Sequence, residues 1–286
     1  MMLNNQKVVD HLRNHWRAYS LLALVVVLNI RVVWDMVADW SADSSYSHGF
    51  LIVPISIWLF CRRRGELVFP GARTKWGWAV LVVGGAGIVL GTAANEYFTL
   101  RLSLVLMVSG LAQVYLGAPN FRKVWFAFFF LLFMIPIPAV IYNSITLPLQ
   151  LLASKISISL LQVIGVPSSR SGNIINLPGC SLEVADACSG LRSLVSLLAV
   201  AALWGHLSLP KGIKQVVLLV GAVPIAILVN TARVFVVAVG VYAVSTDFAE
   251  GFLHELAGMM VFVGALVITL LFGMVLRWIG NRSHPS

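Results

Sequence analysis

The chain has 286 residues, of which 59% are hydrophobic and only 11% are charged. Soluble domains carry about 25% charged residues, so this composition excludes a water-soluble globular protein. The net charge of +9 does not indicate a nucleic-acid partner, because the Lys and Arg form short clusters between apolar runs. Three cysteines are too few for a disulfide scaffold, and no Cys/His cluster has zinc spacing. We therefore expect no metal and no cofactor.

A membrane-spanning helix needs roughly 20 mostly apolar residues, and the sequence has about eight runs that we assign to such helices. They lie at about 18–34, 48–61, 76–94, 99–117, 124–142, 188–204, 214–233 and 256–276. The fold class predicted is an all-α, polytopic transmembrane helical bundle. Residues 1–17 are expected to form a cytoplasmic N-terminal segment, and residues 18–286 a single membrane-embedded domain.

The basic residues predict the orientation, since loops rich in Lys and Arg stay in the cytoplasm. They precede the first, third, fifth and seventh runs and follow the last, as Lys7, Arg13, Arg17, Arg62, Arg63, Arg64, Arg73, Lys75, Arg122, Lys123, Lys211, Lys214, Arg277 and Arg282. Residues 35–47 and 245–255 contain no Lys or Arg and are expected outside. The sequence thus predicts a multi-pass protein of the cytoplasmic (inner) membrane with both termini in the cytoplasm.

Residues 143–165 are apolar enough to span but carry several polar side chains, among them Gln150, Lys155 and Gln162. If this segment crossed the membrane, every later basic loop would face outside. We therefore predict that it lies in the interface or re-enters on the outer face. The loop at about 166–187 then also lies outside, where its apolar residues (Ile174, Ile175, Leu182 and Val184) suggest a short strand pair.

Cys188 is expected at the outer N-terminus of the sixth predicted helix. The amides and dipole of a helix N-terminus stabilise an anion and lower a thiol pKa, and Arg192, one turn on, adds positive charge. Two other readings stay open, an inert buried thiol and a disulfide with Cys180. The neighbouring Ser189 lacks the G-x-S-x-G context of a serine nucleophile.

Two further reactive side chains are predicted at the same outer face, Arg233 near the end of the seventh helix and His254 just before the last. A charged group at the edge of an apolar helix is costly and tends to be functional, and histidine serves as acid and base near neutral pH. Alternatively, Arg233 snorkels to lipid headgroups and His254 is merely solvated. Asn230 and His48 are candidate supporting residues. The sequence H-E-x-x-G after residue 253 excludes a zincin motif.

Taken together, these residues resemble the exosortase/archaeosortase family of membrane transpeptidases. The similarity is carried by Ala187-Cys188-Ser189-Gly190-Leu191-Arg192, by Asn230-x-x-Arg233, by His254 before a final span, and by Ser47-His48-Gly49-Phe50-Leu51 followed by three arginines. The resemblance implies that Cys188, Arg233 and His254 form the catalytic set, supported by Arg192, Ser189, Asn230 and His48.

The resemblance further implies a cysteine protease or transpeptidase with its active site facing the periplasm or outside. Its partners would be membrane lipids and exported proteins with a C-terminal sorting signal of the PEP-CTERM kind, which is a short motif, a transmembrane helix and a basic tail. The alternative is a non-catalytic membrane component of exopolysaccharide synthesis or export, or a non-catalytic scaffold. Only the peptidase needs the thiol of Cys188. The sequence leaves open the acceptor (lipid, sugar or water), the oligomeric state and the exact motif.

Overall fold

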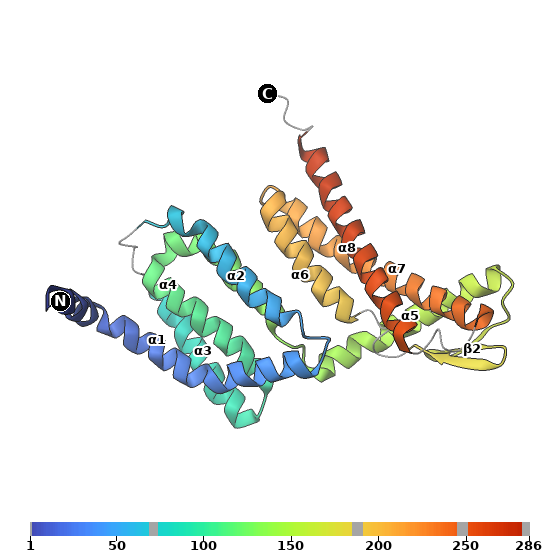
Figure 1. The fold of residues 1–286 in the computed structure, drawn as a ribbon, viewed down its shortest axis with the longest axis horizontal. Helices are drawn as coiled ribbons and strands as arrows, with labels where there is room; N and C mark the ends of the chain where they lie inside the picture. The colour runs from blue at the N-terminus through green and yellow to red at the C-terminus, as the bar shows by residue number, and fades with distance from the viewer. Residues whose placement is uncertain (1, 69–73, 185–190, 245–250, 282–286) are drawn as a thin grey trace. The chain divides into compact units, whose positions relative to one another are not determined.

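The computed structural model describes residues 2–68, 74–184, 191–244 and 251–281, without the side chains of residues 2–18, 192, 251–257 and 280–281. The helices in these residues are α1 (Met2–Ala42), α2 (Gly49–Arg63), α3 (Lys75–Ala94), α4 (Tyr97–Phe130), α5 (Ala139–Val163), α6 (Leu191–Ser208), α7 (Ile213–Ala243) and α8 (Gly251–Asn281), with short 3-10 helices η1 (Arg64–Glu66) and η2 (Leu131–Met134) (Figure 1).

This architecture confirms the predicted all-α, polytopic membrane fold. Six helical segments among the described residues are long and apolar enough to cross a bilayer, and α2 and α6 are shorter apolar helices. Helices are the expected solution because a lipid environment offers no partner for free backbone N–H and C=O groups.

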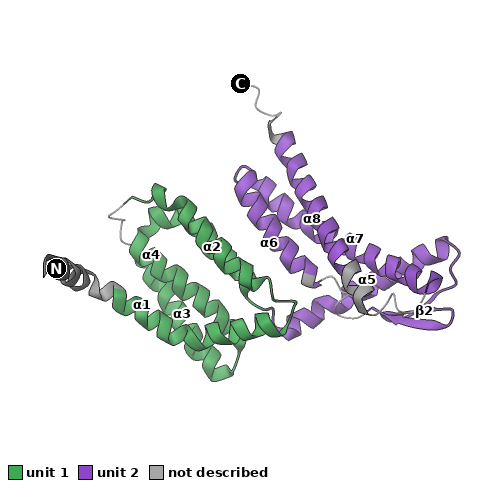
Figure 2. Cartoon of the chain, in the orientation of Figure 1, with its two compact units in different colours: residues 1–136 green, residues 137–286 purple. Residues whose placement is uncertain are grey.

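Two compact units make up the chain, residues 1–136 and residues 137–286 (Figure 2). They meet at the sequence Ile135-Pro136-Ile137-Pro138, where Ile135 is extended and Pro138 is the N-cap of α5. Proline lacks an N–H donor and disfavours helix in the residue before it. The run 124–142, predicted as one span, is therefore interrupted between η2 and α5.

The long helix α4 folds back on itself at Gly117, whose φ of 74° and ψ of 161° are not helical. At the end of α1, Asp39 forms an ion pair with Arg101, and the indole of the next residue, Trp40, donates to the Met134 carbonyl at 3.0 Å. The neighbouring residues Asp39 and Trp40 can reach both Arg101 and Met134 only if these two positions lie close together. In a straight helix they would be about 50 Å apart. The element thus has two antiparallel arms, 97–116 and 118–130, in line with the two separate spans predicted there.

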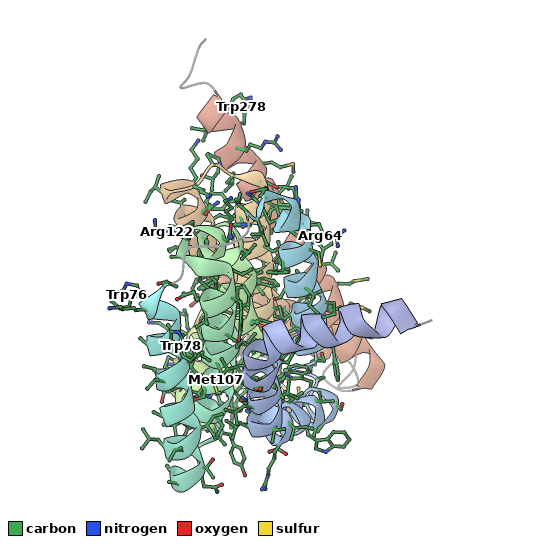
Figure 3. All side chains as sticks on the ribbon, turned by 90° about the vertical axis from the view of Figure 1, so that its left-hand side faces the viewer. Arg64, Trp76, Trp78, Met107, Arg122 and Trp278 are labelled. Carbon is green, nitrogen blue, oxygen red and sulfur yellow. The ribbon has the colours of Figure 1, made fainter. Side chains whose placement is uncertain are left out.

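Three glycines spaced seven residues apart allow α3 to approach the first arm of α4 closely. Gly77, Gly84 and Gly91 are buried, and a Cβ added to them would meet Val114, Met107 and Leu100 of α4, respectively. Figure 3 labels Trp78 and Met107 on this pair of helices. Small residues at a helix interface let two backbones pack tightly in a membrane, where van der Waals contact replaces the hydrophobic effect.

A small antiparallel sheet precedes α6 in unit 2. Its strands β1 (Ser169–Ser171), β2 (Ile174–Leu177) and β3 (Cys180–Glu183) lie in that order, and Ile175 pairs with Leu182. The strand pair predicted from the apolar residues of this loop is therefore present, and β1 adds a third strand that the short polar sequence Ser-Arg-Ser did not indicate. In Figure 1 the sheet lies beside α5 and the C-terminal end of α7.

The polar side chains of residues 143–165 divide between the protein interior and the outer surface of the helix, where Lys155 and Gln162 are exposed. Gln150, Ser154 and Ser157 are buried, and the Ser157 hydroxyl donates to the Thr231 carbonyl of α7 at 3.4 Å. The segment forms the continuous helix α5, which is long enough to span. Its interfacial or re-entrant location stays a prediction, but these buried polar groups no longer argue for it because packing within unit 2 accounts for them.

The fold-back of α4 predicts that Gly117→Ala destabilises the protein by about 1–3 kcal/mol, because a Cβ strains a backbone that only glycine adopts readily. Thermal unfolding in detergent measures the change. Gly85→Ala is the matched control, since Gly85 lies in α3 with open space where a Cβ would be. Equal unfolding temperatures of the two variants would contradict the fold-back at Gly117.

Candidate functional site

Arg233 of α7 lies directly against the backbone of α8. A Cβ built on Gly258 would lie 3.0 Å from Arg233 Nη2 and 3.2 Å from Cζ. Few real Cβ atoms approach another heavy atom this closely, so the bare backbone at Gly258 makes room for the guanidinium. The side chain of Arg233 is thus partly buried against protein and is not simply extended into lipid.

Helices α7 and α8 run antiparallel through this contact. Farther along the pair, a Cβ at Gly221 of α7 would meet the ring of Phe272 of α8. Position 258 is opposite position 233, and position 272 is opposite position 221, so residue numbers rise on one helix as they fall on the other. His254 belongs to α8 one turn before Gly258, and its side chain is outside the described set. Residues four apart share a helix face, so positions 254 and 258 lie on the same face of α8.

Two hydrophobic clusters meet on α7 at Arg233. The first joins Val234, Val237, Ala238 and Val241 to α5 and the sheet. The second joins Leu218, Ala222 and Ala226 to α6 and to Ala265 of α8. Arg233 therefore lies between a half of α7 that supports the sheet and a half that supports the α6–α8 pair.

Each cluster also holds one flank of the segment that contains Cys188. Before the segment, Val184 is 2% exposed, belongs to the first cluster, and exchanges backbone and side-chain hydrogen bonds with Asn173. After it, Leu191 is 2% exposed and belongs to the second cluster. Residues 185–190, with Cys188 and Ser189, are outside the described set. Since successive Cα atoms are 3.8 Å apart, the Cα of Cys188 is at most about 11 Å from that of Leu191.

The other predicted site residues divide between the units. Asn230, one turn before Arg233, is buried at 4% exposure and faces the interior of unit 2. Arg192 is in the first turn of α6, and only its backbone is described. The structure thus brings the helices that carry Arg192, Asn230, Arg233 and His254 into one bundle, whereas the catalytic and supporting roles of these residues stay predictions.

His48 belongs to unit 1, where it ties the start of α2 to η2. Its Nε2 donates to the Phe133 carbonyl at 3.1 Å. Burial lowers the pKa of this imidazole below its ordinary value of 6.5, although the hydrogen bonds with the Phe133 and Ser45 backbones oppose the shift. A neutral ring at pH 7 that satisfies a free helix-end carbonyl is a structural role, and its supporting role in catalysis remains a prediction.

Among the residues that the structure describes, no group of three or more His, Cys, Asp or Glu side chains is arranged to hold a metal ion. What the described part of the site offers is a guanidinium at a fixed position. Such a group binds a carboxylate or stabilises a developing oxyanion. The sequence did not identify Gly258 as a site residue, because the sequence around a glycine in an apolar helix does not indicate which side chain of another helix packs against it.

The fold and this arrangement define a polytopic membrane protein with a charged group held inside its helical bundle. A comparison with known protein families matches residues 40–271 to "Transmembrane exosortase (Exosortase_EpsH)". This match covers most of the chain and both units, and the chain therefore belongs to the transmembrane exosortase family. No curated protein and no solved structure matches the chain.

The contact between α7 and α8 predicts different outcomes for two glycine substitutions on the same helix. Gly264→Ala has open space and is expected to stabilise the protein by up to about 1 kcal/mol through helix propensity. Gly258→Ala gains the same propensity but must displace the Arg233 guanidinium, so its unfolding temperature should fall below that of Gly264→Ala.

A double-mutant cycle isolates the cause of that difference. With Arg233→Ala in the background, the guanidinium is gone, and the two alanine substitutions should have equal effects on thermal unfolding. A difference that persists without Arg233 would show that something other than this contact disfavours a side chain at position 258.

Proposed function

We propose that this exosortase is a membrane cysteine protease or transpeptidase that cleaves the C-terminal sorting signal of exported proteins. Family membership supports the class of protein. The observation that carries the chemistry is the Arg233 guanidinium seated against Gly258, between the two clusters that anchor either flank of Cys188. A thiol close in sequence to the first described turn of α6 and an arginine fixed on the neighbouring helix are the parts that acyl transfer needs.

Activation of the thiol follows from the start of α6. The first described helical residue is Leu191, and the free amides of a helix N-terminus carry a partial positive charge. Arg192 adds a full positive charge in the same turn. Both favour the thiolate of Cys188 over the thiol and lower its pKa. Ser189 and Asn230 are proposed to support this arrangement through hydrogen bonds.

In the acylation step, the Cys188 sulfur attacks the scissile carbonyl carbon, and the carbonyl oxygen takes up the negative charge. Arg233 stabilises that oxyanion. As the carbon–nitrogen bond breaks, His254 in its protonated form donates its proton to the leaving amine. The products of this step are a thioester on Cys188, a free amine and a neutral imidazole.

In the second step, an acceptor amine or water attacks the thioester carbonyl carbon, and His254 removes a proton from it. The carbon–sulfur bond then breaks and the Cys188 thiolate returns. A substrate that is held by its own transmembrane helix shares the plane of the membrane with the enzyme, which raises its effective concentration at the site. The proposed location is the outer face of the cytoplasmic (inner) membrane, with both termini of the enzyme in the cytoplasm.

Replacement of the nucleophile tests the proposal directly. Cys188→Ala should abolish cleavage of a co-expressed substrate that carries a sorting motif, a transmembrane helix and a basic tail, while its abundance in the membrane stays unchanged. Cys61→Ala on α2 and Cys180→Ala on β3 are the matched controls and should cleave normally. Cleavage by Cys188→Ala would refute the peptidase and favour the non-catalytic component of exopolysaccharide synthesis or export.

Arg233→Gln should lower the cleavage rate about 10²–10³-fold, which is the usual loss when one oxyanion donor is removed. Arg233→Lys keeps the charge but loses the bidentate guanidinium donor, so its cleavage rate should lie between those of Arg233→Gln and the wild type. The control is Arg170→Gln on β1, whose guanidinium is exposed and donates to the Leu151 and Gly172 carbonyls. Western blots of substrate processing over time give the rates, and equal losses at positions 170 and 233 would remove Arg233 from the chemistry.

A further inference from the structure

Unit 1 contains an apolar cavity of about 440 Å³ that no part of the proposed cleavage reaction uses. It lies between α1, α2, both arms of α4, and η2. Its wall is formed by aliphatic and aromatic side chains, including Val33, Met36, Ile57, Val105 and Phe128. Ser56 also lines it, but its hydroxyl oxygen is buried and gives the wall no polar surface. Because apolar cavities stay dry and bind apolar molecules when they can, the wall selects a hydrocarbon and not water or a soluble metabolite.

The cavity is elongated along the helices that enclose it. On α2 it extends from Val53 to Phe60, and on α1 from Val33 to Trp40, in each case about 10 Å along the helix axis. The segments of α1 and α4 beside it are long and apolar enough to cross the bilayer. At that depth, the molecules at hand are lipid chains and other membrane helices, and a narrow space parallel to the helices fits a chain.

Basic side chains gather at the Phe60–Phe128 end of the cavity. The exposed Arg64 follows Phe60 by four residues and continues the face of α2 that lines the cavity. Arg62 lies on the opposite face, with its guanidinium 5.4 Å from the Trp58 ring centroid. Arg122 and Lys123 of α4 join them, and Figure 3 shows Arg64 and Arg122 at the same end of unit 1. Nearby, Arg63 forms an ion pair with Glu66 at 3.1 Å. Arg64 is therefore the arginine placed to contact a phosphate at this end of the cavity.

We propose that this cavity binds one acyl chain of an anionic phospholipid, with the phosphate against Arg64 at the end of the cavity that Phe60 lines. Clusters of Lys and Arg beside membrane helices attract anionic headgroups, and the cavity turns that general attraction into a defined site. The site lies within unit 1 and does not depend on the proposed cleavage activity.

The test is native mass spectrometry of the full chain in non-ionic detergent, with phosphatidylglycerol or phosphatidylcholine added back. We expect about one tightly bound phosphatidylglycerol per chain. Ala127→Phe fills the cavity, since Ala127 lines it and is 5% exposed, and should abolish this binding. Ala86→Phe adds the same ring to the exposed face of α3 and should leave it unchanged. Ser56→Leu, a smaller change within the wall, serves if Ala127→Phe fails to fold.

The headgroup is tested separately by Arg64→Gln. This variant should weaken binding of phosphatidylglycerol about fivefold and leave that of phosphatidylcholine unchanged. The proposal is overturned if the wild type holds no more lipid than the filled variants, if Ala86→Phe loses as much as Ala127→Phe, or if the wild type is a dimer that the filling substitution dissociates. That last outcome would identify a second copy of the chain as the occupant.

Discussion

The burial of both halves of α7 is the interaction on which unit 2 depends. Toward its C-terminus, Val234, Val237 and Val241 pack on α5 and the sheet, and toward its N-terminus Leu218 packs on α6 and α8. Each such aliphatic side chain contributes about 1.5–3 kcal/mol when fully buried. Because the sheet and α6 pack on the same helix, Val184 and Leu191, the described residues on either side of Cys188, are both held to the helix that carries Arg233. The position of a charged residue between two apolar clusters is thus a result of packing.

Unit 1 meets a different constraint, since its backbone is broken at two places where lipid cannot satisfy free carbonyls. Side chains from other segments supply the missing donors. The Asn120 amide donates to the Leu116 and Val68 carbonyls beside the fold-back of α4. At η2, Trp40 donates to the Met134 carbonyl and His48 to the Phe133 carbonyl. These three residues explain how irregular backbone persists between apolar helices.

Hydropathy and charge were sufficient to predict the helical membrane fold, the break between the two arms of α4, and the strand pair in the loop before Cys188. These features depend on runs of residues, which a sequence displays directly. The interruption at Pro136–Pro138 was not predicted, since the span assigned to 124–142 runs through it. Prolines also occur inside spans, and only tertiary contacts decide whether the helix ends there. The same holds for Gly258, whose role is defined by an arginine 25 positions away on another helix, and for α5, in which Ser154 and Ser157 are buried against protein.

The glycine stripe on α3 limits how this protein can adapt to membranes of other thickness. Gly77, Gly84 and Gly91 recur every seven residues, a period at which two helices wind gently around each other with a left-handed twist. One added residue would rotate the remaining stripe by about 100° and turn bulky side chains toward α4. Only an insertion of about seven residues, which lengthens a helix by about 10 Å, would restore the fit, so the thickness that this helix pair matches changes in steps and not continuously.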